Sequence, residues 1–397
     1  MIKVLLQVPN TKGWIGGLNY FINLCSALES EGRNMVMPVI LGENVNLPHP
    51  LNKYSNLIPE EYRIVPLSRF NPLGILTKLL RRTKGLTYRD AIIRTLLKND
   101  IALFSHGFPL GPASPIPSLC WIPDFQHRHL PQFFSKTEIE GRDKHQQKYA
   151  EEAQAMLFSS YAALSDFNRF YPQSKAICSV LHFVAIPDFS NEQNSEAVLC
   201  RYQIREPYFH LPNQLWAHKN HQVVLDALRI LKDRGACPLV ISTGFKEDHR
   251  DPSYPERLIA RVAAAGLDER FRFLGGIAYN DVFSLMKGSL ALINPSLFEG
   301  WSTTVEEGKS LGKTILLSDI PVHREQAPLR GRYFDSTDPA GLADMMRQVL
   351  DEYDPRQEDA FSKIAAMELP GRVRQFAWAY EDIVKNVLAV SGRSSQT

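Results

Sequence analysis

Two glutamates are the residues of this chain best placed to do chemistry. Glu299 and Glu307 lie in the stretch Phe298–Gln326, FEGWSTTVEEGKSLGKTILLSDIPVHREQ, with seven residues between them. The first falls in a loop and the second in the first turns of a helix, so the two side chains can flank one helix end. Carboxylates do not bind phosphate, but they accept hydrogen bonds from sugar hydroxyls on either side of a diphosphate. The alternative is that both glutamates only complement the helix dipole.

The sequence around these glutamates predicts a strand, a loop and then a helix. A strand is expected over 290–294, and Thr303 and Glu306 have the spacing of a capping box. We therefore expect a helix from about Thr303 to Gly312, with Glu306 at the cap or directed toward solvent. A helix N-terminus just past the carboxyl end of a parallel strand presents unpaired N–H groups where open α/β sheets bind ligands. The pattern predicts a phosphate site.

A lysine precedes a second expected helix. Lys219 lies in Leu211–His221, LPNQLWAHKNH, between the end of a strand and a helix that begins near Gln222. A cation beside a helix start is unfavourable unless an anion is bound there, which favours Lys219 as a phosphate ligand over a solvated helix end.

Two loops of the first half are further candidates. Thr11–Tyr20, TKGWIGGLNY, is not a GxGxxG motif, but the adjacent Gly16 and Gly17 let the backbone approach a ligand, unless this is an ordinary strand-to-helix turn. Trp121–Leu130, WIPDFQHRHL, suggests a metal site through its histidines and acid, yet no fourth ligand is spaced to complete it, so we expect no metal.

A basic segment is the last candidate. Residues 71–99 carry Lys78, Arg81, Arg82, Lys84, Arg89, Arg94 and Lys98 against one acid, Asp90. Leucines share one helical face of this segment and cations the other, which fits either a solvated face or a segment lying on anionic lipid.

The composition bounds the class of protein. The chain has 397 residues, 44% apolar and 22% charged, as expected for about two globular domains, and its formal charge of +2 excludes a global basic field for nucleic acid. Five scattered cysteines without a CxxC pair argue against a disulfide framework. With no signal peptide or membrane-spanning run, we expect a cytoplasmic protein, possibly peripheral on the membrane.

Short β-branched runs alternate with helical segments, which predicts parallel sheets covered by helices in an α/β fold. The expected strands are 2–8, 101–105, 118–122, 157–159 and 177–181 in the first half, and 208–211, 238–243, 271–274, 290–294 and 314–317 in the second. A polar linker is expected at 187–205 with a short helix over 195–202, and a long apolar-faced helix over 371–390 after Pro370, which must dock on a domain.

Glu299 and Glu307, with seven residues between them, are followed by a helix end, an apolar strand and the sequence Ser-Asp-Ile-Pro-Val-His-Arg-Glu. This order resembles the donor-site signature of the retaining glycosyltransferases of family four. The resemblance covers nearly the whole chain and implies the GT-B fold, two facing Rossmann-like domains with a cleft between them. It implies an acceptor-side domain over 1–185, a linker over 186–205, a nucleotide-sugar domain over 206–375, and a final helix over 376–397 that packs back on the first domain.

Carried over residue by residue, the resemblance implies that Glu299 approaches the donor sugar and Glu307 the nucleotide ribose. The amides around Ser302, Thr303 and Thr304 would meet the sugar and phosphates. Gly300, Trp301 and Ser302 stand where the family more often has a GxG turn, and the resemblance implies that they contact the donor.

The same resemblance gives roles to the other loops. Lys219 fits the family's phosphate-binding lysine, whereas Gln214, next to Asn213, stands at the place of its arginine, so His218, His221 or another cation would have to replace that charge. Gly16 and Gly17 would touch donor phosphate and acceptor. Pro123 stands where family members place a histidine before Asp124; His127 could supply that imidazole, oriented by Asp124, or be a structural histidine.

The sequence thus predicts a metal-independent enzyme without a cofactor that moves a sugar, by front-face displacement, from a nucleotide-sugar donor to a saccharide or lipid-linked acceptor in polysaccharide or glycolipid assembly. The catalytic residues would be Glu299, Lys219 and His127. Alternatives are a nucleotide-sugar-binding protein without turnover, and a hydrolase or epimerase on the same fold.

Overall fold

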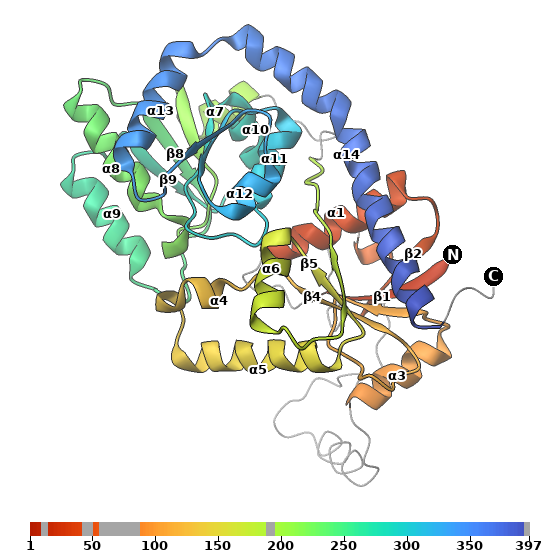
Figure 1. Cartoon of the computed structure of the whole chain (residues 1–397). Helices are drawn as coiled ribbons and strands as arrows, with labels where there is room; N and C mark the ends of the chain where they lie inside the picture. Colours follow the sequence, from red (N-terminus) through yellow and green to blue (C-terminus); the bar gives the residue numbers. More distant parts are fainter. Residues whose placement is uncertain (9–14, 42–50, 55–87, 188–194, 393–397) are drawn as a thin grey trace, which may run out of the picture.

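A computed structural model describes residues 1–8, 15–41, 51–54, 88–187 and 195–392 (Figure 1). It contains two six-stranded sheets, each with all its strand pairs parallel. The first has the order β2-β1-β3-β4-β5-β6 and the second β12-β11-β10-β7-β8-β9. Parallel neighbours need helical crossovers, so both sheets are covered by helices on both faces, as the alternating sequence pattern predicts.

The strands of the first sheet are β1 (Ile2–Gln7), β2 (Val36–Leu41), β3 (Leu103–Ser105), β4 (Ser118–Ile122), β5 (Ala155–Phe158) and β6 (Ile177–Val180). Its described helices are α1 (Ile15–Glu31), α3 (Tyr88–Lys98), α4 (Gln126–His129), α5 (Lys136–Glu152) and α6 (Tyr161–Phe170). Apolar residues of α1 pack on one face, and those of α3, α5 and α6 on the other.

The strands of the second sheet are β7 (Tyr208–Leu211), β8 (Leu239–Thr243), β9 (Phe271–Gly275), β10 (Leu292–Asn294), β11 (Ile315–Ser318) and β12 (Gly331–Phe334). Its helices are α7 (Ser195–Arg201), α8 (His221–Asp233), α9 (Tyr254–Ala264), α10 (Tyr279–Gly288), α11 (Thr303–Leu311), α12 (Pro321–Gln326) and α13 (Pro339–Glu352). Helices α8, α9 and α13 pack on one face, and α7, α10 and α11 on the other.

Helix α14 (Pro355–Val390) joins the two halves (Figure 1). It starts beside the second sheet, where Glu358 pairs with Lys313 and Arg330, and its later turns bury Phe376 and Tyr380 in the core of the first sheet. The predicted docking of this tail is confirmed by its packing on α1. Its predicted start after Pro370 is wrong: the helix begins at an Asp354 cap and runs through the proline, because buried residues before and after it hold both segments in one line.

Two further differences from the predicted elements concern edge strands. The sequence analysis does not predict β2 and β12, which lie at the edges of their sheets. Strand β2 contains Pro38, which an edge position tolerates because its missing N–H needs no partner on the open side. Part of the predicted linker forms α7, as expected. Val198 of this helix packs in a core cluster with residues of β7, β8 and α10, so this part of the linker belongs to the second half of the chain.

Candidate active site

The carboxyl ends of strands β7 and β10 and the N-terminus of α11 meet in one place. Ser302 is the N-cap of α11: its hydroxyl accepts a hydrogen bond from the Val305 N–H and receives one from Asn294 Nδ2 at 2.7 Å. The predicted capping box of Thr303 and Glu306 is therefore wrong: the cap is Ser302, and Val305, three residues later, has no polar side chain to complete a box. The amides of Thr303 and Thr304 lie in the first turn, where backbone N–H groups have no intrahelical acceptor. As predicted, the helix ends at Gly312, which has φ 70°.

The sequence analysis expects Glu306 at the cap or directed toward solvent, but the structure shows this side chain buried. Its side chain is 1% exposed, and its carboxylate pairs with Lys309 at 2.9 Å and Arg372 at 2.5 Å. Arg372 belongs to α14, sixty-six positions along the chain, so a local pattern could not reveal this partner. Glu306 thereby ties α11 to the helix that connects the two halves.

Gln326 holds the start of α11, a role that no sequence signal revealed. Its Nε2 donates to the Ser302 carbonyl at 2.9 Å and to Glu306 Oε1 at 3.1 Å, and its Oε1 accepts from the Ser302 N–H at 3.3 Å. The Ser302 amide, which the resemblance assigns to the donor, is therefore bonded within the protein.

Lys219 and Glu299 are brought together by the fold. Lys219 Nζ donates to Glu299 Oε1 at 2.6 Å, with side chains only 16% and 10% exposed. Burial raises the pKa of Glu299, but the charge of Lys219 and the hydrogen bonds from Lys219 and Ser296 outweigh this effect, so that its pKa lies below the usual value. Glu299 is thus an ionised carboxylate at neutral pH.

Asn220 directs Lys219 toward this place. It adopts the left-handed conformation, with φ 55° and ψ 40°, between the short 3₁₀ turn Ala217–Lys219 and α8. Its side-chain amide donates to the carbonyls of Pro295 and Ser336 at 3.2 and 2.9 Å, which anchors the turn beside the end of β10. The unusual conformation suits an asparagine.

Glu307 lies on the same helix end as Glu299 but pairs with a different group. It is buried, and Tyr279 Oη donates to its Oε1 at 2.6 Å. Burial raises the pKa of Glu307 to about 7, against the lowering effect of the Tyr279 hydrogen bond. The two glutamates therefore differ at neutral pH: Glu299 is ionised, whereas Glu307 is close to half-protonated.

The residues at the end of β7 lie close to α11. Asn213 Nδ2 is 3.5 Å from Asn294 Oδ1, Thr304 Oγ1 donates to the Pro212 carbonyl at 3.2 Å, and Gln214 is half-buried. Asn213 is also crowded by Gly244, at which a Cβ would lie 2.5 Å from the Asn213 carbonyl oxygen.

His218 and His221 do not supply the positive charge expected from them. Both are buried, and burial lowers the pKa of His218 well below its usual value and that of His221 to about 3. Both imidazoles are therefore neutral. The cations whose charges act on His218 most strongly are Lys219 and Arg250.

The loop after β4, in the first half of the chain, lies close to the loop between β10 and α11, in the second half. A Cβ at Gly300 would lie 2.7 Å from the Pro123 carbonyl oxygen and 2.9 Å from Asp124 Cβ, so only glycine fits there. Asp124 Oδ1 accepts from the Gln126 N–H at 2.9 Å. This places Asp124 beside the Glu299–Gly300 turn.

His127 does not contact Asp124 in the way the sequence analysis suggests. The ring is fully buried, and its Nε2 lies 2.9 Å from Asp143 Oδ1 of α5, so Asp143 orients it. Burial lowers the pKa of His127 despite Asp143. Its Nδ1 makes no hydrogen bond among the described residues.

Trp301 packs between the two halves. Its Nε1 donates to the Phe183 carbonyl at 3.1 Å, and its ring stacks on His182 at 4.3 Å and 5°. Its side chain is thus held by the first half of the chain, in contrast to the expected contact with donor.

The two adjacent glycines lie in a helix. Gly16 and Gly17 belong to the first turn of α1, which begins at Ile15, and the preceding residues 9–14 lie outside the described ranges.

The described part of the chain contains neither a candidate metal site nor a membrane-spanning helix. No group of three His, Cys, Asp or Glu side chains there could hold a metal ion. Nor does any described helix combine the length and apolar character needed to cross a membrane.

Comparison with known proteins agrees with this geometry. Residues 204–366 match the family described as glycosyl transferases group 1. The O-antigen chain mannosyltransferase B of Escherichia coli is 23% identical over 255 residues, a region that covers 62% of this chain and 63% of the relative's length.

Three solved structures share the architecture. A glycosyltransferase from Rickettsia africae superposes with a TM-score of 0.69 at 16% identity, over 98% of both chains. HepE from Anabaena, in complex with UDP-glucose, gives 0.65 at 16% identity, over 98% of this chain and 100% of that one. WaaG, a glycosyltransferase involved in lipopolysaccharide biosynthesis, gives 0.64 at 15% identity, over 96% of this chain and 99% of the other. The chain therefore has the GT-B fold of these glycosyltransferases, and residues 204–366 match the group 1 glycosyl transferase family.

Proposed function

We propose that the chain transfers a sugar, with retention of anomeric configuration, from a nucleotide-sugar donor to a hydroxyl of a saccharide acceptor. The observation that carries the proposal is the Lys219–Glu299 pair, 2.6 Å long and largely buried, beside the first turn of α11. A cation, a carboxylate and unpaired helical amides at one point fit a glycosyl diphosphate, whose phosphates need positive charge and whose sugar presents hydroxyls.

Each group has a part in the transfer. Lys219 has three N–H donors, so it can hold Glu299 with one and direct the others to diphosphate oxygens. The Thr303 and Thr304 amides add donors, and the helix dipole favours the charge that develops on the leaving diphosphate. Glu299, kept ionised, accepts hydrogen bonds from the donor sugar.

Glu307 holds the ribose of the nucleotide in this proposal. Its carboxylate is buried one turn into α11, and Tyr279 occupies only Oε1. In front-face displacement, a donor phosphate oxygen takes the proton of the acceptor hydroxyl while the glycosidic bond to phosphate breaks. Contact of the two halves excludes water, whose attack would hydrolyse the donor.

Relatives and the sequence support the proposed acceptor and place of action. The mannosyltransferase and lipopolysaccharide relatives favour a role in polysaccharide or glycolipid assembly and make a mannosyl donor one candidate beside UDP-sugars. Attachment to the cytoplasmic face of an anionic membrane through 71–98 is part of the proposal. Residues 71–87 lie outside the described ranges, and in α3 Arg89 pairs with Glu152, so the cations of 78–84 would carry the attachment.

The experiment is a donor panel of UDP-, GDP-, dTDP- and ADP-sugars with release of nucleoside diphosphate as readout. We expect one donor class to be turned over by the wild type, and Glu299→Gln to lose roughly tenfold to hundredfold in turnover. Glu368→Gln, at an exposed position of α14, is the control and should retain full turnover. Wild-type turnover in Glu299→Gln, or no donor consumed by the wild type, would contradict the proposal.

Independence from metal is tested in the same assay. Lys219 and the α11 amides can carry the diphosphate charge, so we expect turnover to persist in EDTA. Complete inactivation that magnesium or manganese reverses would show that a cation carries that charge instead.

A further inference from the structure

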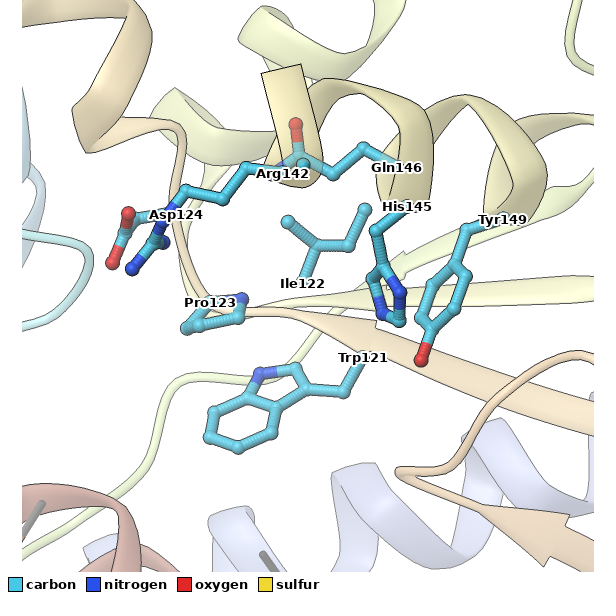
Figure 2. A pocket seen from close by; sticks show the side chains of 9 residues that line it. Trp121, Ile122, Pro123, Asp124, Arg142, His145, Gln146 and Tyr149 are labelled. Atoms are coloured by element: carbon cyan, nitrogen blue, oxygen red, sulfur yellow. The ribbon is translucent and has the colours of Figure 1, made fainter. Parts of the chain in front are cut away.

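A pocket of about 380 Å³ lies in the first half of the chain, between the carboxyl end of β4 and helix α5 (Figure 2). Figure 2 shows Arg142 extending from α5 toward Asp124, and His145 and Tyr149 extending side by side from α5 toward β4. The volume is in the range of pockets that hold small ligands.

The pocket lies next to the donor loop. Asp124 lines the pocket and also packs against Gly300, where an added Cβ would lie 2.9 Å from Asp124 Cβ. Gly300 directly follows Glu299. The pocket therefore shares Asp124 with the surroundings of Gly300, so an acceptor held at this wall would lie beside the proposed sugar site.

The α5 side of the pocket is aromatic. The rings of His145 and Tyr149 lie 4.3 Å apart at 43°, and burial, followed by the charge of Lys148, lowers the pKa of His145, which keeps its ring neutral. Gln146, which is buried, adds an amide that can donate and accept. Neutral aromatic faces with a few polar groups suit a sugar ring.

Two arginines bring positive charge to this side of the pocket: Arg142 lines the pocket, and Arg250 contacts the same Phe134 ring as Arg142. The guanidinium carbons of Arg142, from α5, and Arg250, from the second half, lie 5.0 and 4.2 Å from the centroid of the same Phe134 ring. Among the described residues neither makes an ion pair, and Arg250 Nη1 donates to a neutral group, Gln126 Oε1, at 2.7 Å.

Electrostatics at Arg250 agrees with an excess of positive charge. Burial and then the charge of Arg142 lower its pKa, although Asp124, Asp248 and Glu138 act in the opposite direction. Its Nε is buried and has no hydrogen-bond partner among the described residues. Two like charges near one another, neither with an ion-pair partner among the described residues, favour an anion bound beside them.

We propose that this pocket binds the acceptor and that the acceptor sugar carries an acidic group, a carboxylate or a phosphate, which Arg142 and Arg250 hold. The inference rests on the proposed glycosyltransferase function and names the acceptor's chemical class. Arg142 and Arg250 come from different halves of the chain, so an anionic acceptor also favours their contact.

The test uses three probes: methyl β-D-glucuronide, glucose 6-phosphate and neutral methyl β-D-glucoside, titrated into the full-length protein by saturation-transfer NMR. We expect at least one anionic sugar to bind roughly tenfold or more tightly than the neutral glycoside. Whichever anion binds identifies a carboxylate or a phosphate as the group. Equal or weaker binding of both anionic sugars would overturn the proposal.

Variants locate the binding. Arg142→Ala should weaken binding of the anionic sugar roughly tenfold and leave the neutral glycoside unchanged, and Arg142→Lys should recover part of the loss. The matched control is Lys144→Ala, an exposed cation of the same helix that does not line the pocket, and it should bind like the wild type. An equal loss in Lys144→Ala, or none in Arg142→Ala, would contradict the assignment to this pocket.

Donor turnover without acceptor separates the two proposals. Slow hydrolysis of the nucleotide sugar by the wild type reports on the donor site alone, and Lys144→Ala, which lies outside the pocket, should hydrolyse the donor at the same rate. Donor hydrolysis with no preference for anionic sugars would leave the proposed function standing and remove this inference. No donor hydrolysis or transfer in the wild type would remove the proposed function itself.

Discussion

The indole of Trp301 lies flat on the imidazole of His182, with 4.3 Å between the ring centroids and 5° between the planes. The two residues come from different halves of the chain, and Trp301 directly precedes the N-cap of α11. His182 is held in turn by Glu325 Oε1 at 2.6 Å, and the same carboxylate accepts the N–H groups of Tyr161 and Ala162 at the start of α6. The start of α11 is therefore attached to the first half of the chain.

Loss of this contact should reduce transfer more than donor binding. Trp301→Ala removes a stacked pair and a hydrogen bond, worth together about 2 kcal/mol of unfolding free energy. We expect turnover to fall roughly tenfold, because the two halves are no longer held in the relative position that transfer requires. The affinity for nucleotide should stay within about twofold of the wild-type value. Urea unfolding, transfer rate and calorimetric nucleotide binding measure the three quantities.

A second tryptophan is the control for this prediction. Trp378 of α14 donates to the Glu31 carbonyl and packs under Arg33, within the first half of the chain. Trp378→Ala should lower stability without changing turnover relative to folded protein. A parallel loss of turnover in both variants would mean that stability alone explains the effect of Trp301.

Gly300 provides an independent test of whether the two halves must lie close together for transfer. Gly300→Ala adds a methyl group 2.7 Å from the Pro123 carbonyl oxygen, a distance that real contacts do not reach, so the loop after β4 must move away. We expect transfer to fall at least tenfold, with nucleotide binding retained because the α11 amides are unchanged.

Gly371→Ala is the matched control, since nothing lies within 4 Å of the added methyl group in the middle of α14. It should stabilise the protein by roughly 0.5–1 kcal/mol through higher helix propensity and leave transfer unchanged. Normal transfer in Gly300→Ala would show that close contact between the two loops is unnecessary for the reaction.

These contacts show what the sequence could predict and what it could not. The strand, loop and helix around Glu299 and Glu307 follow from local signals, namely a short apolar run, a cap residue and Gly312, so their prediction is confirmed to within a residue or two. The same holds for Lys219 at a helix start, although its direct pairing with Glu299 joins segments eighty residues apart.

The prediction errors arise where the position of a side chain is set by a partner far away in the sequence. Glu306 appears polar and exposed in its own helix, but Arg372 and Gln326 bury it. Trp301 lies inside the motif but serves the contact with His182. The sequence does not predict edge strand β12, because Gly331 and Arg332 do not form part of an apolar run. These residues form a strand by pairing with the neighbouring strand β11.

The Lys219–Glu299 pair predicts a specific pattern of stability and activity. Lys219→Met leaves Glu299 buried without its cation and should cost about 3 kcal/mol of unfolding free energy. The double variant Lys219→Met with Glu299→Gln removes the unpaired charge and should regain most of that loss, whereas turnover should remain at least tenfold reduced in both. Denaturant unfolding and nucleoside diphosphate release measure the two effects.

An exposed ion pair is the comparison for this cycle. Arg332→Met breaks the surface pair with Glu352, whose side chains are 34% and 60% exposed, and should change stability by less than about 1 kcal/mol. If Lys219→Met cost no more than Arg332→Met, the buried pair would not be held as the structure shows.

The raised pKa of Glu307 predicts that nucleotide binding depends on pH. Free protein has Glu307 half-protonated at about pH 7, and hydrogen bonds from ribose hydroxyls favour the ionised form, so its pKa should fall on binding. Affinity for nucleotide should therefore be highest above pH 8 and fall up to about tenfold per pH unit below 7. Calorimetric titrations of the nucleoside diphosphate at pH 6, 7 and 8 measure this slope.

Glu307→Gln gives the control, because its amide does not titrate. Its nucleotide affinity should be lower and nearly independent of pH in this range. The stability of the wild-type protein should decrease with rising pH, whereas its nucleotide affinity increases. The pKa of Glu307 in the folded protein is about 7, above the value of 4.5 for an unperturbed glutamate. Ionisation of Glu307 therefore lowers the free energy of unfolding of the wild type as pH rises from about 4.5 through 7. At pH 8 the variant, which buries no charge, should therefore be more stable than the wild type, by an amount on the order of 3 kcal/mol at most. A variant that is less stable at pH 8, or whose binding keeps the wild-type pH slope, would show that a group other than Glu307 titrates with the ligand.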